Sequence, residues 1–209
     1  MDGVGRDDDR RIWDAEAAGF DAAPDHGLRD PVVREAWRSL LAAELPPAPA
    51  RIADLGCGTG TLVRLLAEEG HRVDGLDVAP EMIRRAEAKI AGIQGATVRL
   101  GDANDPDLDP GSFDVVLSRH VLWAMRDPAD ALRRWLRLVR PGGRVVLVEG
   151  RWSTGVGLAR ADTVDLVRGA GLAPESRLLD DPALWGGPIG DERYLVVADL
   201  PPAPLAEVD

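Results

Sequence analysis

The alternation of two kinds of segment from Arg51 onward most constrains the fold of this chain. Short apolar segments typical of strands lie at 51–55, 71–77, 97–102, 113–118, 143–150, 176–180 and 193–199. Helical segments bounded by proline or glycine separate most of them, at 61–70, 80–92, 128–140 and 161–171. Strands that alternate with helices of about ten residues predict an α/β fold, in which a mostly parallel sheet carries helices on both faces.

The first fifty residues follow a different pattern. Residues 1–10 are charged and we expect them to be disordered, whereas 31–45 carry apolar residues at helical spacing. The proline-rich stretch 46–50 predicts a stiff connector. We therefore divide the chain into an N-terminal helical cap at residues 1–50 and a core at residues 51–209.

Charge and cysteine content disfavour several classes of protein. The 209 residues carry a formal net charge of −11, which disfavours a protein that follows nucleic-acid phosphates, although a local patch could still hold such a substrate. Cys57 is the single cysteine, so neither an internal disulfide nor a cysteine-based metal site can form within one chain. Without a signal peptide or a long apolar run, we expect a cytoplasmic protein with no membrane partner. The oligomeric state is not indicated.

The ends of the expected strands carry the residues of interest, because ligands bind there in such sheets. The turn Gly56–Gly60 holds three glycines, which let a ligand approach the backbone. Asp77 ends the next strand, where an acid commonly accepts hydrogen bonds from a ribose diol. Asp102 follows the third strand and can accept from an exocyclic amine, while the N–H of Ala103 can donate to a ring nitrogen. Together these positions predict an adenosine site.

Two residues beside the glycine turn decide what is attached to the adenosine. A dinucleotide-binding pattern would need Gly or Ala at position 61, where this chain has Thr61. Asp54 would repel a pyrophosphate, yet it can orient an ammonium group and suits a nearby sulfonium. S-adenosylmethionine carries both cationic groups, so these residues favour it over a nicotinamide dinucleotide.

Five segments resemble, in order, the motifs of class I S-adenosylmethionine-dependent methyltransferases. They are ADLGCGTG (53–60), GLDVAPEMI (75–83), GDAND (101–105), FDVVLSRHVLWAM (113–125) and RPGGRVVLVEG (140–150). The resemblance covers about residues 51–150 and is closest to the compact small-molecule branch of the family. It implies a Rossmann-like sheet of seven strands, in which the last strand, 193–199, is antiparallel and lies beside 176–180.

The resemblance also implies a cofactor site. The methionine end of the cofactor would lie against Asp54 and the glycine turn, the ribose against Asp77, and the adenine against Asp102. The expected cofactor-binding residues are Asp54, Gly56, Cys57, Gly58, Thr59, Gly60, Asp77, Val78, Met82, Asp102, Ala103, Ser118 and Arg119.

The implied reaction transfers the methyl group directly to a small-molecule acceptor by in-line displacement. It needs no metal, and no ligand cluster is evident in the sequence. A general base helps only if the acceptor carries a proton, and His120 is the first candidate because it follows the fourth strand. His26 is the second candidate, since it lies in the cap. Packing beneath the next segment, or a structural role in a turn, is the alternative for each, and we expect His71 at the surface.

Aromatic residues suggest where the acceptor binds. Trp13, Phe20, Trp123 and Trp152 lie in segments that could border the site, as does Trp185, and a tryptophan-rich pocket suits a planar, apolar or cationic acceptor. Ordinary packing is the alternative, and it is the expected role of the remaining two tryptophans, at 37 and 135. A non-catalytic protein that binds the cofactor as a regulator or partner subunit remains the alternative function, and neither the acceptor nor the methylated atom is indicated.

Overall fold

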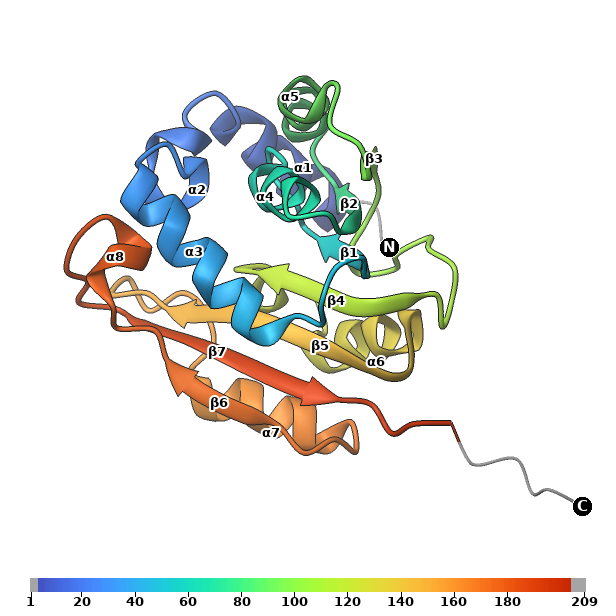
Figure 1. Ribbon diagram of the computed structural model, residues 1–209. Helices are drawn as coiled ribbons and strands as arrows, with labels where there is room; N and C mark the ends of the chain where they lie inside the picture. The colour runs from blue at the N-terminus through green and yellow to red at the C-terminus, as the bar shows by residue number, and fades with distance from the viewer. Residues whose placement is uncertain (1–3, 204–209) are drawn as a thin grey trace, which may run out of the picture.

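The computed structural model describes residues 4–203 of the chain, with side chains from residue 10 (Figure 1). Its centre is one sheet with the strand order β3-β2-β1-β4-β5-β7-β6. The strands are β1 (Arg51–Leu55), β2 (Arg72–Asp77), β3 (Ala96–Leu100), β4 (Phe113–Arg119), β5 (Val139–Arg151), β6 (Glu175–Leu178) and β7 (Glu192–Asp199). The first five pair in parallel, and β7 is antiparallel to both of its neighbours. The predicted Rossmann-like architecture with an antiparallel last strand is confirmed.

Helices cover both faces of the sheet (Figure 1). The helices of the described part of the chain are α1 (Val4–Glu16), α2 (Pro24–Gly27), α3 (Pro31–Glu44), α4 (Thr61–Glu68), α5 (Pro80–Ile90), α6 (Pro128–Leu138), α7 (Arg160–Gly169) and α8 (Pro182–Trp185), with 3-10 turns η1 (Phe20–Ala22) and η2 (Leu122–Ala124). Side chains of α3, α4, α5 and α8 pack on one face, and those of α6 and α7 pack on the other.

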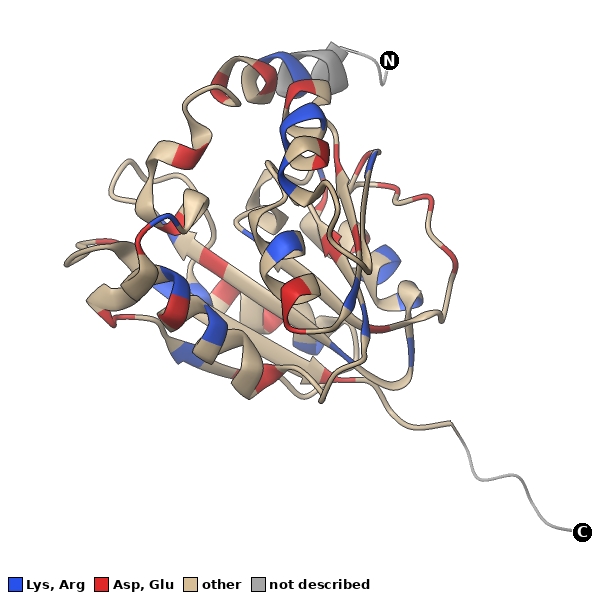
Figure 2. Cartoon of the chain, turned by 45° about the horizontal axis from the view of Figure 1, so that its top comes forward, with Lys and Arg blue, Asp and Glu red and all other residues tan. Residues whose placement is uncertain are grey.

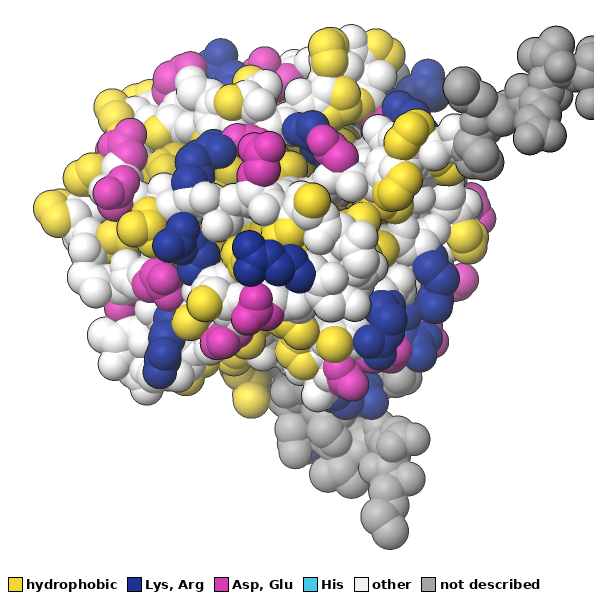
Figure 3. Space-filling model, turned by 90° about the horizontal axis from the view of Figure 1, so that it is seen from below, with side chains coloured by type: hydrophobic (Ala, Val, Ile, Leu, Met, Phe, Trp, Pro, Cys, Tyr) yellow, Lys and Arg dark blue, Asp and Glu magenta, His cyan; other side chains and the backbone are white. Residues whose placement is uncertain are grey.

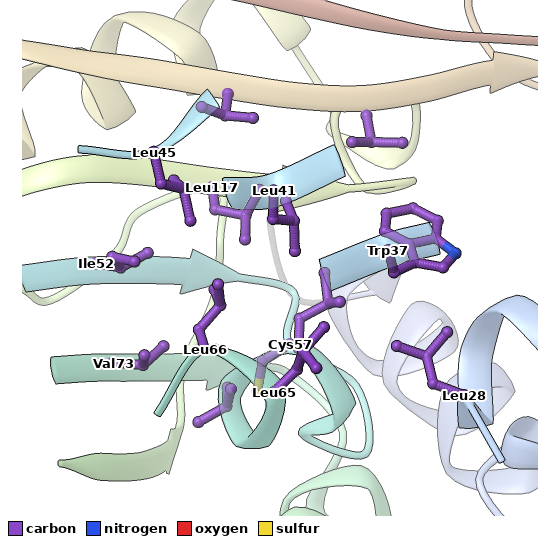
Figure 4. Close-up of a cluster of buried hydrophobic side chains, with 14 of the residues drawn as sticks. Leu28, Trp37, Leu41, Leu45, Ile52, Cys57, Leu65, Leu66, Val73 and Leu117 are labelled. Atoms are coloured by element: carbon purple, nitrogen blue, oxygen red, sulfur yellow. The ribbon is translucent and has the colours of Figure 1, made fainter. Parts of the chain in front are cut away.

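The alternation of side chains along each strand builds the two apolar layers. Ile52 of β1 packs in the layer that also holds Trp37, Leu41 and Leu117, whereas Leu55 lies in the opposite layer (Figure 4). Trp37 and Trp135 are fully buried, as the sequence predicts. Both strand faces are therefore apolar, and polar groups can concentrate only where the strands end.

Two expectations from the sequence are wrong. Residues 4–10 belong to α1 instead of being disordered, because α1 packs against α5, and the Asp14 carboxylate accepts a hydrogen bond from the backbone N–H of Glu81 at 2.9 Å. Residues 1–3 of that stretch lie outside the described residues. His71 is buried at 8% exposure, because its Nδ1 accepts a hydrogen bond from the Ala50 N–H at 3.3 Å.

The surface carries charges of both signs. Acidic residues and arginines are interspersed along the helices (Figure 2), and the view from below shows the same mixture among apolar side chains (Figure 3). Between residues 4 and 203, none of the helices combines the length and the apolar character needed to cross a bilayer.

Candidate active site

A cavity of about 390 Å³ lies where β1, β2 and β4 end. The sheet reverses its order of strands between β1 and β4, and such a switch point leaves a crevice at the carboxyl ends of the strands. The cavity brings together most of the residues singled out in the sequence: Trp13, Phe20, His26, Asp54, Gly56, Cys57, Gly58, Asp77, Val78, Met82, Asp102, Ala103, Arg119, His120, Trp123 and Trp152.

Three expected cofactor residues do not line the cavity. Ser118 is fully buried at the end of β4, and Gly60 precedes α4 with a positive φ of 75°. Thr59 is also buried, and its hydroxyl donates a hydrogen bond to Asp21 Oδ1 at 2.5 Å. None of these three residues presents surface to a ligand in the cavity.

The glycine turn and Asp77 form one hydrogen-bonded unit. The N–H of Gly58 donates to Asp77 Oδ2 at 2.9 Å, and the N–H of Ala79 donates to Oδ1 at 2.9 Å. Gly56 has a φ of 75°, and a Cβ atom there would lie 2.3 Å from Val121 Cγ2. Only glycine therefore allows the turn to pass this close to the segment after β4.

Asp54 is a buried acid at the cavity wall. Its side chain is 2% exposed, and burial raises its pKa to about 7, helped by the nearby Asp77 and opposed by Arg119. A cationic ligand would favour the ionised carboxylate over the neutral acid. The site is thus suited electrostatically to an ammonium or sulfonium group.

Asp102 belongs to a second polar group in the cavity lining, in the loop after β3. Its Oδ1 accepts hydrogen bonds from the backbone N–H of Asn104 at 2.8 Å and from Asn104 Nδ2 at 2.9 Å. Arg126 Nη2 lies 3.4 Å from Asp102 Oδ2. Trp135 Nε1 donates to the carbonyl oxygen of Ala103 at 2.7 Å, which fixes the loop after β3.

The cap segment, which we define as residues 10–30, covers the glycine turn. Lys89 of α5 lies 2.8 Å from Asp21 Oδ2 and donates to the hydroxyl of Thr59 at 2.8 Å and to that of Thr61 at 2.5 Å. Phe20 lies directly over Gly58, since a Cβ atom on that glycine would be 3.2 Å from Phe20 Cε1. These contacts join the cap segment to the glycine turn, to the start of α4 and to the end of α5.

His120 has an unusual backbone conformation at the cavity wall. Its φ is 61°, a left-handed conformation that residues other than glycine rarely adopt. Its Nε2 is buried and finds no hydrogen-bond partner within the described part of the chain. Burial lowers the pKa of His120 well below its usual value, and the charges of Arg119 and Arg193 lower it further. The lowered pKa favours the neutral imidazole, whose Nε2 is buried and unpaired within the described part of the chain.

His26 lies close to His120 but comes from α2. Its ring stacks on Phe20 with a centroid distance of 4.2 Å, and its Nε2 is 3.5 Å from Asp25 Oδ2. Burial lowers the pKa of His26, and Arg119 lowers it further. Asp25 and the two histidines are the one group among the described residues close enough to hold a metal, with ligand atoms within 4.8 Å. The two guanidinium groups that face His120 oppose the charge of a dication there.

The aromatic residues divide into two groups. Trp13 and Phe20 belong to the cap segment and pack against Ala79 and Met82. Trp123 and Trp152 contact each other with a centroid distance of 5.6 Å, and both line the cavity near His120.

Trp185 does not reach the cavity. It is buried, its ring stacks on His120 at 6.0 Å, and its Nε1 donates to the Leu179 carbonyl oxygen. The packing alternative therefore applies to this tryptophan.

Sequence reasoning missed several cavity residues. They are Leu62, Asn104, Val121, Ala124, Met125, Arg126, Thr154 and Val156. Asn104 lies inside the GDAND segment, and Val121, Ala124, Met125 and Arg126 follow β4. Closeness to a strand end was therefore an available signal for these five residues. Thr154 and Val156 lie in the long connection after β5, for which the sequence offered no pattern.

Residues 53–147 match the family model described as a methyltransferase domain. The matched range carries a methyltransferase domain and is similar to the class I S-adenosylmethionine-dependent methyltransferases. The methyl donor of such a methyltransferase is S-adenosylmethionine, as the strand-end residues predicted. Asp54, Asp77 and Asp102 all fall within the matched range.

The chain is similar to two curated O-methyltransferases. It is 34% identical over 140 residues to the ubiquinone biosynthesis O-methyltransferase of Xanthomonas axonopodis pv. citri, covering 66% of this chain and 55% of the relative. It is 38% identical over 119 residues to the nocamycin O-methyltransferase of Saccharothrix syringae, covering 54% of this chain and 42% of the relative. The chain spans about half the length of the curated relatives it matches.

A solved structure shows a similar arrangement. A chain in the complex between the Haloferax volcanii Trm112 methyltransferase activator and a methyltransferase gives a TM-score of 0.71 at 25% identity. The match covers 90% of this chain and 97% of that chain, and so includes most of the cap as well as the sheet.

Proposed function

We propose that this chain transfers a methyl group from S-adenosylmethionine to a small-molecule acceptor. The observation that carries the proposal is a cavity whose lining holds two unlike sets of residues. The first set, Asp54, the glycine turn, Asp77 and Asp102, suits the cofactor, and we call it the cofactor wall. The second set, Trp123, Trp152 and His120, is proposed to face the acceptor, and we call it the acceptor wall. A methyl transfer needs the sulfonium and the acceptor held together away from water, and a shared cavity meets that need.

The acceptor we propose is a planar molecule with an oxygen nucleophile. Aromatic walls favour planar ligands, and two relatives are named as O-methyltransferases. His120 is the proposed general base, because the residue lines the cavity and its buried Nε2 has no hydrogen-bond partner among the described residues. An imidazole with a lowered pKa is a weak base, so the proposed acceptor carries an acidic hydroxyl, such as a phenol or enol.

The cap completes the proposed site. Residues 1–50 are proposed to cover the cofactor and to supply His26, Trp13 and Phe20 to the cavity, while residues 51–209 form the cofactor-binding core. His26 is proposed to support His120, since the two side chains lie close together at the acceptor wall. This arrangement keeps the reacting atoms out of contact with solvent.

The test incubates the purified chain with S-adenosylmethionine and a panel of phenols and enols, and measures release of S-adenosylhomocysteine. We expect turnover with at least one acceptor. His120→Asn keeps a residue that tolerates positive φ, and it should lower the rate by about 10²–10⁴-fold without loss of cofactor binding. His71→Gln, outside the cavity, is the matched control and should retain the rate. Tight cofactor binding without turnover across a broad panel would favour the non-catalytic alternative.

A further inference from the structure

Glu149 is a buried acid at the cavity end of β5. Its side chain is fully buried, and its Oε1 accepts two backbone hydrogen bonds. The N–H of Val121 donates at 3.0 Å and the N–H of Leu122 donates at 2.7 Å. A single carboxylate oxygen therefore connects the end of β5 to the segment that follows β4.

The segment held by Glu149 forms one side of the cavity. His120, Val121 and Trp123 all line it, and the indole N–H of Trp123 donates to the His120 carbonyl oxygen at 2.9 Å. Val121 packs against Gly56 of the glycine turn. A shift of this segment would therefore move the acceptor wall and the cofactor wall together.

The backbone here needs an external support. His120 has a φ of 61°, and the chain leaves the β4 ladder directly after the His120 N–H, which donates to the Val148 carbonyl oxygen at 2.8 Å. A left-handed residue other than glycine costs of the order of 1–3 kcal/mol and persists only where its surroundings hold it. The two N–H groups that follow have no strand partner, and Glu149 supplies their acceptor.

Burying the Glu149 side chain lowers the stability of the folded chain. Burial raises its pKa to about 8, and its Oε2 has no hydrogen-bond partner among residues 10–203. An apolar residue would avoid that cost but would leave the N–H groups of Val121 and Leu122 without an acceptor. The buried acid therefore contributes by fixing the conformation of the segment after β4.

We propose that Glu149 is a positioning residue, whose Oε1 fixes Val121 and Leu122 and thereby presents His120 to the acceptor. The consequence for catalysis rests on the proposed function, whereas the structural consequence does not. Glu149 is not among the residues that line the cavity, so we propose that it acts through the segment that it holds.

The experiment compares Glu149→Gln with Glu149→Leu. Glutamine keeps an acceptor oxygen, whereas leucine removes it at similar volume. Amide hydrogen exchange at Val121 and Leu122 is the first readout, and it requires no acceptor molecule. Tyr194→Phe is the matched control, because Tyr194 is buried and is the β7 partner of Glu149 in the sheet, but it bonds to Thr163 and Leu158.

We expect exchange at the two amides to quicken by about tenfold or more in Glu149→Leu, and to stay near the wild-type rate in Glu149→Gln and Tyr194→Phe. Methyl transfer should fall at least tenfold in the leucine variant and be retained in the glutamine variant, while S-adenosylhomocysteine binding shows that the variants are folded. Equal exchange in the two Glu149 variants, or an equal effect of Tyr194→Phe, would overturn the proposal. So would unprotected Val121 and Leu122 amides in the wild-type protein, a result that needs no folded variant.

Discussion

Asp77 connects local structure to the proposed ligand site more directly than any other side chain. Both of its oxygens already accept backbone hydrogen bonds, from Gly58 and Ala79, so the carboxylate fixes the turn as well as facing the cavity. Each oxygen retains a lone pair that a ribose hydroxyl can use. The residue therefore shapes the backbone and remains available to a ligand.

Asp77→Ala should weaken binding of S-adenosylhomocysteine by about 1.5–3 kcal/mol, the scale of hydrogen bonds to a charged group. Titration calorimetry measures the change. Asp74→Ala is the matched control, because Asp74 lies on the same strand but pairs with Arg51 and lies outside the cavity. Equal affinities for Asp77→Ala and wild type in folded proteins would place the ribose elsewhere.

Asp54 should make cofactor affinity depend on pH. Its pKa is raised to about 7 in the unliganded site, and a cationic ligand stabilises the ionised form. Affinity for S-adenosylmethionine is therefore greatest above about pH 7 and falls as the pH drops through that value, by at most tenfold per unit. Calorimetry between pH 5.5 and 7.5 checks this. If Asp54→Asn shows the same slope as wild type, the dependence belongs to another group.

Sequence reasoning found the polar residues that stand at strand ends but did not predict the hydrogen bonds that join one strand end to another. Asp54, Asp77 and Asp102 each follow from the expected strand pattern together with the glycine turn. The N–H groups of Val121 and Leu122, after β4, donate to Glu149 of β5, and no sequence pattern predicts this contact. The left-handed conformation of His120 is likewise a product of packing and not of local preference.

At the scale of elements, the cap segment is held by few polar contacts. Lys89 is the centre of one of them, with Asp21 and the hydroxyls of Thr59 and Thr61 around it. Arg119 Nη1 provides another, by donating to the backbone carbonyl oxygen of Asp25. The sequence predicted a cap but not its attachments, since Lys89 lies in the last turn of α5 and has no motif of its own.

Lys89→Met should loosen the cap segment, because it leaves the half-buried Asp21 carboxylate without its ion pair. We expect a local loss of about 1–2 kcal/mol, visible as faster hydrogen exchange across η1 and α2. Arg84→Met is the control on the same helix, since Arg84 is largely exposed and pairs with Glu81 of the same helix. Equal exchange in the cap segment of both variants would show that apolar contacts alone hold it.

The assignment of α1 shows where sequence patterns are weakest. Residues 4–16 are rich in charge and present little apolar surface, so their helix depends on packing against α5 rather than on a strong pattern. The core, by contrast, was predictable because the central strands β1, β4 and β5 are largely buried and most of its helices begin at a proline or end at a glycine. Tertiary contacts therefore decide the cap, whereas local patterns decide the core.

For the molecule as a whole, deletion of residues 1–30 tests whether the cap belongs to the proposed reaction. The deletion removes Trp13, Phe20 and His26 from the cavity but leaves the sheet and the glycine turn. We expect methyl transfer to fall far more than affinity for S-adenosylhomocysteine, because the acceptor loses its cover while Asp77 and Asp102 remain. Circular dichroism checks folding, and full turnover by the folded, truncated chain would show that the cap only covers the sheet.

The central claim is that the cavity at the ends of β1, β2 and β4 binds the adenosine cofactor of a methyltransferase. Titration of the purified chain with S-adenosylhomocysteine, and with NAD in parallel, tests it most directly. We expect one molecule of S-adenosylhomocysteine per chain, and at 100 times its dissociation constant a stabilisation of about 2.7 kcal/mol, seen as a raised melting temperature. NAD should leave the melting temperature unchanged. No binding and no thermal shift with millimolar S-adenosylhomocysteine would contradict the account.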